Sequence, residues 1–131
     1  YAQTADWGEN WQQPQSGLDH TYCWSVAVDA ADPECVLVSA ASGAGDAHRA
    51  PGEAYLYRKE GDSWKRLETA VPTGEGALRG VLQRGDAGEF WAANDHGLYR
   101  TTDGGDSWRP TDIDWPDRLT NQTCRGLTLV T

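Results

Sequence analysis

The stretch that decides the expected fold is Leu98-Tyr99-Arg100-Thr101-Thr102-Asp103-Gly104-Gly105-Asp106-Ser107-Trp108. An earlier segment, Leu56 to Trp64, has the same Leu-Tyr-Arg start and the same Gly-Asp-Ser-Trp end, with two fewer residues between them. A third copy, Thr4 to Trp11, lies near the start of the chain. The tryptophans that close the copies are 53 and 44 residues apart, which suits a repeat of about 40–50 residues built as one four-stranded unit.

Short apolar runs recur in a fixed order between these copies. The runs 24–28, 79–83 and 125–129 correspond to one another, and so do 35–39 and 89–93. Each run has the length and the β-branched or aromatic content of a short strand, and Gly, Asp, Pro or Asn bounds it. The sequence therefore predicts an all-β protein made of four-stranded antiparallel units.

The order of these runs predicts β-propeller blades, about two and a half of them, in one partial domain over residues 1–131. Residues 1–21 would end one blade and carry the first copy of the turn. Residues 22–76 would form a full blade, and residues 77–122 a second full blade with its own turn. Residues 123–131 would be a lone inner strand that closes a ring.

The repeated turn has a structural explanation. Its carboxylate can accept hydrogen bonds from backbone N–H groups of the turn, its glycine permits a positive φ, and its tryptophan can fold back as an apolar plug. None of these roles is catalytic. The residues assigned to them are Thr4, Asp6, Gly8, Trp11, Gly61, Trp64, Thr101, Asp103, Gly105 and Trp108.

The pattern Ser/Thr-x-Asp-x-Gly-x-x-Trp resembles the Asp-box, or BNR, repeat of sialidase-type β-propellers. The first and third copies match at every defined position, whereas the middle copy has Tyr57 and Lys59 in place of Ser/Thr and Asp. Residues 22–58 also resemble bacterial and archaeal propellers described as glycosyl hydrolase-like. The resemblance implies the fold but leaves the function open, since the same repeat occurs in enzymes, receptors and scaffolds.

Two and a half blades cannot close a ring, and open blades would expose strand edges. We therefore expect the chain to be the C-terminal part of a larger propeller, with the remaining blades supplied by upstream sequence or by another chain. A ring made of copies of this chain is the competing interpretation. Ten strands per chain divide awkwardly for such a ring.

The net charge of −9 argues against nucleic-acid and anionic-membrane partners, which require clustered Lys and Arg. An Asp-rich chain with two lysines fits either a protein of high-salt surroundings or an ordinary acidic protein. No apolar run reaches the ~20 residues of a membrane span, and residues 1–4 lack the features of a signal peptide. The compartment stays unassigned.

Three widely spaced cysteines form no disulfide framework and no zinc signature, so we expect free thiols and assign no cofactor. The ligand-binding candidates lie in loops expected at the blade end opposite the repeated turns: His20, His48, Arg49, His96 and Arg118. Histidines on separate loops lack local metal-ligand spacing, so no metal site is assigned. Arg79 and Arg125 occupy equivalent places, and we expect each to pair with a nearby Asp rather than to bind an anionic sugar.

Two functions remain open. The first is a non-catalytic module that binds a carbohydrate or a protein through this loop face. The second is part of a sialidase-like or other glycoside hydrolase, which would need paired carboxylates or a tyrosine nucleophile with a carboxylate. The catalytic candidates for that alternative are Asp95, Asp117 and Tyr22.

Overall fold

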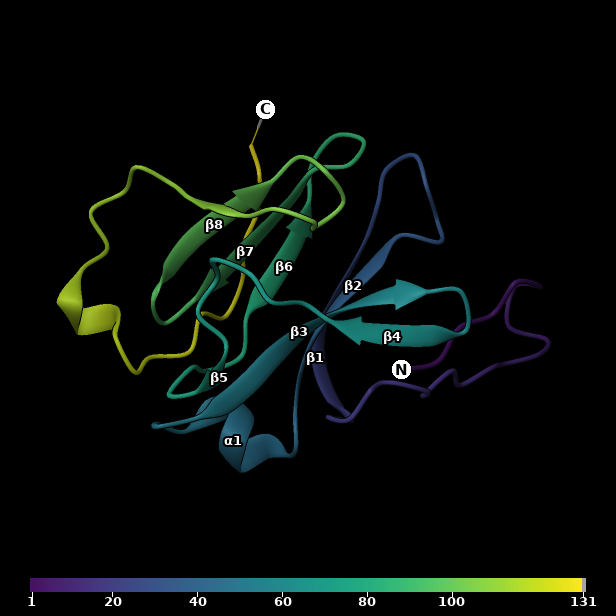
Figure 1. Cartoon of the computed structure of the whole chain (residues 1–131), viewed down its shortest axis with the longest axis horizontal. Coiled ribbons are helices and arrows are strands. Elements are labelled where there is room, and N and C mark those ends of the chain that lie inside the picture. Colours follow the sequence, from purple (N-terminus) through teal and green to yellow (C-terminus); the bar gives the residue numbers. More distant parts are fainter. Residues whose placement is uncertain (131) are drawn as a thin grey trace.

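The computed structural model describes residues 1–130 and is all-β, with two antiparallel sheets (Figure 1). In each sheet, four strands follow one another in chain order. The first sheet contains β1 (Tyr22–Val28), β2 (Val36–Ala41), β3 (Glu53–Glu60) and β4 (Ser63–Arg66), and the short β5 (Gly74–Glu75) pairs with β3. The second contains β6 (Val81–Arg84), β7 (Phe90–Asn94), β8 (Gly97–Thr101) and β9 (Arg109–Pro110).

The strand positions agree with the apolar runs of the sequence, but three features differ from expectation. A short helix, α1 (Ala44–His48), occupies the loop between β2 and β3, and β5 adds a fifth strand to the first sheet. Residues 123–130 form no strand, in contrast to the expected inner strand. Thr131, the last residue of the expected closing strand, lies outside the described residues. The 3₁₀ helix η1 (Asp117–Leu119) precedes this segment.

The turns over residues 4–11 and 101–108 have the same hydrogen bonds. In each, the threonine hydroxyl donates to the aspartate, and the glycine N–H donates to the threonine oxygen. Each aspartate also accepts from the backbone N–H four residues later, and each tryptophan Nε1–H donates to the glycine carbonyl at 3.1 Å. The two glycines have φ of 93° and 95°, a region that a side chain would disfavour.

The middle copy, with Lys59 in place of the aspartate, forms a tight hairpin instead. Gly61 has φ of 61° at the β3–β4 turn, and the side chain of Lys59 is buried with its Nζ 2.6 Å from Glu34. Trp64 is buried like Trp108, and its Nε1–H donates to the carbonyl of Pro14. In the other two copies a carboxylate accepts hydrogen bonds within its own turn, whereas in the middle copy the ammonium of Lys59 bonds to a neighbouring turn.

The two sheets pack face to face around one apolar cluster. Leu37 and Leu56 from the first sheet meet Leu82, Phe90 and Tyr99 from the second, and Trp108 closes the cluster. The inner strands β1 and β6 lie side by side, where the Ser25 hydroxyl accepts the N–H of Leu82. The opposite face of the first sheet is covered by the N-terminal segment, with Tyr1, Leu18 and Trp64 in a second cluster.

Turn-to-turn bonds tie the sheets together at the end that carries the repeated turns. The Asp29 carboxylate accepts N–H groups from its own turn and from Gly88 of the second sheet. The Gly88 carbonyl accepts the N–H of Gly104, and Arg58 donates to the Gly104 carbonyl and to Asp106. Among residues 1–130, no helix is long and apolar enough to cross a membrane.

Candidate functional site

At the opposite end of the sheets, a polar cluster surrounds a buried arginine. Four segments contribute to it: the start of β1, the helix α1, the residues before β6 and the C-terminal segment. The cluster consists of Tyr22, Trp24, His48, Arg79 and the carbonyl of Cys124. Two of these residues, Tyr22 and His48, are among the sequence-predicted candidates.

Arg79 is the centre of the cluster and is only 3% exposed. Its Nε donates to Nδ1 of His48 at 2.9 Å, and its Nη1 donates to the carbonyl of Cys124 at 2.8 Å. The guanidinium lies over the ring of Trp24, with 4.1 Å from Cζ to the ring centroid, a cation–π distance. Among residues 1–130, Arg79 has no carboxylate partner, so the expected ion pair with an aspartate is wrong.

The Arg79 contact fixes the protonation of His48. An arginine Nε can only donate, so Nδ1 of His48 must be the acceptor and the ring proton lies on Nε2. Nε2 is 3.2 Å from the hydroxyl of Tyr22 and can donate to it. Burial, and after it the charge of Arg79, lowers the pKa of His48 below its ordinary value. The imidazole is therefore neutral at pH 7.

The guanidinium itself remains charged. Burial lowers the pKa of Arg79 from its ordinary value, but an arginine keeps its proton under all physiological conditions. Nη2 has no hydrogen-bond partner among residues 1–130. The ring of Trp24 beside it is 48% exposed. The cluster thus has one guanidinium nitrogen without a partner among residues 1–130, close to a half-exposed aromatic ring, an arrangement suited to a planar anion such as a carboxylate.

The three histidines do not form one site. Nδ1 of His20 lies 2.5 Å from the hydroxyl of Tyr57, and its ring stacks on Tyr55 at the outer face of the first sheet. His96 is exposed, with Nε2 3.0 Å from the carbonyl of Gly76. Each histidine therefore has its own local partners. In residues 1–130, no group of three His, Cys, Asp or Glu side chains is placed to hold a metal ion.

The remaining candidates lie outside the cluster. Asp95 is completely buried, and its two oxygens accept the N–H groups of Leu78 and Asn121. It holds the backbone that leads into Arg79, so it is a positioning residue. The other three, Arg49, Asp117 and Arg118, are exposed.

Sequence reasoning missed Trp24 and the carbonyl of Cys124. Trp24 alternates with Val26 and Val28 on the exposed face of β1, a pattern that the sequence shows as a period of two. The Cys124 carbonyl had no sequence signal, because a backbone contact to a distant segment depends on the path of the chain. Comparison of the chain with protein-family models, curated proteins and solved structures gave no significant match.

Proposed function

We propose that this chain supplies blades of an Asp-box β-propeller. We also propose that the blade end opposite the repeated turns binds a ligand that carries a carboxylate, and that the ligand's carboxylate is the group that is bound. Three observations support the propeller. Two four-stranded meanders follow each other, the same turn joins β8 to β9 and the bridged residues Gln3 and Gln12, and the sheets pack face to face with inner strands adjacent. Residues 1–21 and 123–130 would then complete blades shared with further strands.

One observation carries the ligand proposal: Arg79 is a buried cation without a carboxylate partner among residues 1–130. Burying a charge is costly unless an opposite charge or several hydrogen bonds compensate for it. His48 and the Cys124 carbonyl compensate in part, and both are neutral. A ligand carboxylate at Nη2 would supply the missing negative charge.

The same geometry favours binding over glycoside hydrolysis. A tyrosine nucleophile requires a nearby carboxylate as its base, whereas the Tyr22 hydroxyl lies against a neutral histidine. Both oxygens of Asp95 are engaged by backbone N–H groups, and Asp117 is exposed at the start of η1. Neither carboxylate faces the tyrosine through a hydrogen bond.

Calorimetric titration tests the proposal. We expect glucuronate, a sugar with a carboxylate, to bind, and glucose at the same ionic strength not to bind. A peptide with a free C-terminal carboxylate, compared with its amide, distinguishes a protein ligand from a sugar ligand. The Arg79→Met substitution should remove binding of every carboxylate probe, while Arg49→Met, at an exposed arginine outside the cluster, should retain it.

The Arg79→Met protein is expected to fold, because Arg79 has no counter-charge among residues 1–130 and an apolar side chain avoids the cost of burying a charge. Its unfolding by urea measures this directly. Carboxylate binding by the Arg79→Met protein, or no binding by the unaltered protein, would refute the ligand proposal.

A further inference from the structure

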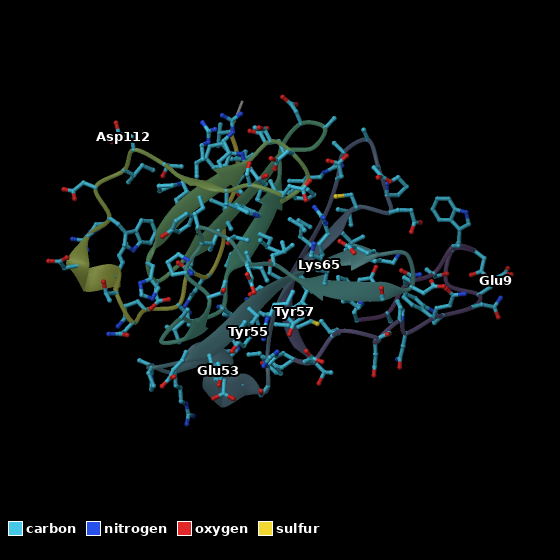
Figure 2. All side chains as sticks on the ribbon, viewed as in Figure 1. Glu9, Glu53, Tyr55, Tyr57, Lys65 and Asp112 are labelled. Carbon is cyan, nitrogen blue, oxygen red and sulfur yellow. The ribbon has the colours of Figure 1, made fainter. Side chains whose placement is uncertain are left out.

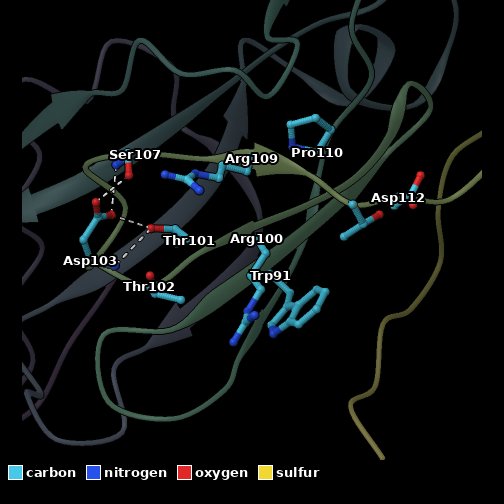
Figure 3. A pocket seen from close by; sticks show the side chains of 10 residues that line it. Trp91, Arg100, Thr101, Thr102, Asp103, Ser107, Arg109, Pro110 and Asp112 are labelled. Carbon is cyan, nitrogen blue, oxygen red and sulfur yellow. Dashed lines mark hydrogen bonds between the residues drawn. The ribbon is translucent and has the colours of Figure 1, made fainter.

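An open hollow of about 610 Å³ lies on the outer face of the second sheet (Figure 3). Trp91, Arg100 and Arg109 are directly opposite one another on β7, β8 and β9, so they form one row across this face. Figure 3 shows Trp91 and Arg100 side by side on the same side of the sheet. Arg109 has no ion pair among residues 1–130, and facing arginines repel each other. Arg100 and Arg109 are thus the two cations of a hollow that the carboxylates of Asp103 and Asp112 also line.

In the first sheet, the equivalent face is covered by the repeated turn of the next sheet. Arg58 occupies the same place in the repeat as Arg100, in the shared Leu-Tyr-Arg sequence. Arg58 bonds to one acid of its own sheet, Glu60, and to Asp106 in the turn of the next sheet, at 2.6 Å. Leu37 on the same face lies against Gly105 of that turn, where a Cβ would be 3.4 Å from the leucine.

Arg100 bonds to an acid of its own sheet, but among residues 1–130 it has no bond to an acid in the turn of a following sheet. Its Nε is 2.6 Å from Glu89 of its own sheet, and the side chain is 49% exposed. No turn of a following sheet reaches it within residues 1–130. The row of Trp91, Arg100 and Arg109 is therefore the counterpart of a face that, one repeat earlier, is covered by an Asp-box turn.

The N-terminal turn, residues 4–11, has no sheet face to pack on among residues 1–130. Trp11 is 62% exposed, whereas Trp108, at the same position of the later turn, is 5% exposed in the core. Glu9 stands where the later turn has Asp106, and it has no ion pair among residues 1–130. Figure 2 shows Glu9 at the tip of this turn and Asp112, which lines the hollow, near the opposite end of the molecule. The turn therefore cannot reach the hollow of its own chain.

We propose that the hollow receives the N-terminal turn, residues 4–11, of a second copy of this chain. Glu9 of the second copy pairs with Arg100, as Asp106 pairs with Arg58 within one chain, and Trp11 becomes covered by the Trp91 face. The contact is head-to-tail, so it builds either a closed ring or an open chain of copies. It involves none of the residues of the Arg79 cluster, and its failure would leave the ligand proposal untouched.

Sedimentation velocity over a wide range of protein concentration tests this proposal at low ionic strength. We expect the unaltered chain to associate reversibly and Arg100→Glu to weaken association roughly tenfold or more through charge repulsion. Arg100→Gln should have a smaller effect in the same direction. The control is Arg49→Glu, the same charge change on an exposed loop, which should associate like the unaltered chain.

A charge exchange makes the test specific. The Arg100→Glu protein and the Glu9→Arg protein should each associate poorly alone and should associate when mixed, because the mixture restores opposite charges at every contact. Circular dichroism establishes that both variants are folded. An unaltered chain that stays monomeric at all concentrations refutes the proposal. Association that both substitutions leave unchanged refutes it as well.

Discussion

The two ends of the sheets differ in how their charges are satisfied. At the end with the repeated turns, Asp29, Arg58 and Lys59 each bond to a group from a neighbouring turn, and these bonds tie the sheets together. At the loop end, Arg79 is as deeply buried as Lys59, but its partners among residues 1–130 are all neutral. Removing one partner of such a buried pair is strongly destabilising, and a buried charge without a counter-charge costs stability, as groups in a binding site often do.

Substituting one tryptophan at each end should give the largest difference in the free energy of unfolding. Trp108 is 5% exposed in the core at the turn end, so Trp108→Ala should lower the free energy of unfolding by about 3–5 kcal/mol. Trp24 at the loop end is half exposed, and Trp24→Ala should cost about 1 kcal/mol or less. Urea unfolding of both variants measures this. Equal losses would mean that the loop end is as important for stability as the turn end.

Glu34 gives the next largest effect. Removing this carboxylate leaves the buried ammonium of Lys59 without its charged partner, which should cost about 1–3 kcal/mol. The matched control is Glu60→Ala, since Glu60 is exposed and Arg58 keeps its bond to Asp106; we expect a change within about 0.5 kcal/mol. Urea unfolding compares the two. If Glu34→Ala lowers the free energy of unfolding as little as Glu60→Ala does, the bond between Lys59 and Glu34 does not stabilise the fold.

Below about pH 4, acid should weaken the turn end through its aspartates. The side-chain bond from Ser107 is the main cause that lowers the pKa of Asp103 to about 2, and the backbone N–H of Asn10 is the main cause for Asp6, also to about 2. Since their pKa values are about 4 in the unfolded chain, these carboxylates stabilise the fold above pH ~4 and lose that effect as the pH falls towards ~2.

The Asp103→Asn substitution tests this acid dependence. The variant should be less stable than the unaltered protein at neutral pH, and its stability should fall less steeply below pH ~4. Chemical unfolding at a series of pH values gives both quantities. Parallel curves for the two proteins would show that the Asp103 carboxylate is not stabilised in the folded turn.

The smallest effect is expected at the loop end, from His48. Its folded pKa is lowered, so the unfolded chain binds the proton more readily, and stability falls as the pH drops below the unfolded value of about 6.5. In His48→Gln the amide oxygen can still accept from Arg79, and this part of the pH dependence should disappear. Comparing the melting temperatures of both proteins at about pH 7.5 and 5.5 subtracts the other histidines. If the change in melting temperature between the two pH values is the same for His48→Gln and the unaltered protein, His48 is not held neutral in the fold.

The sequence predicted eight of the strands and the two complete turns because local patterns decide them, but it missed β5 and predicted a strand over residues 123–131 that does not form in residues 123–130. The Leu-Tyr-Arg repeat and the Thr-x-Asp-x-Gly-x-x-Trp pattern place β3, β8 and the two turns, since their hydrogen bonds close within eight residues. Helix α1 was missed because it has only five residues and a glycine at its second position.

The site was predicted in part. Tyr22 and His48 were identified as candidates from their loop positions, but the partner of Arg79 was wrong. The abundance of aspartates in the sequence gave no information about which group would reach Arg79. In the structure α1 brings His48 to the guanidinium, and no carboxylate among residues 1–130 pairs with it. Contacts of this kind depend on how loops from several strands meet.

Whether Arg79 is held for a ligand carboxylate can be measured most directly by heteronuclear NMR during titration with acetate. Acetate at Nη2 should move the Arg79 Nε–H signal and the Trp24 indole N–H signal along saturating curves with one dissociation constant. Chloride at the same ionic strength should move them less, and the Trp108 indole signal should stay in place. Identical, non-saturating drifts with acetate and chloride would contradict the proposal that this end of the molecule binds a carboxylate.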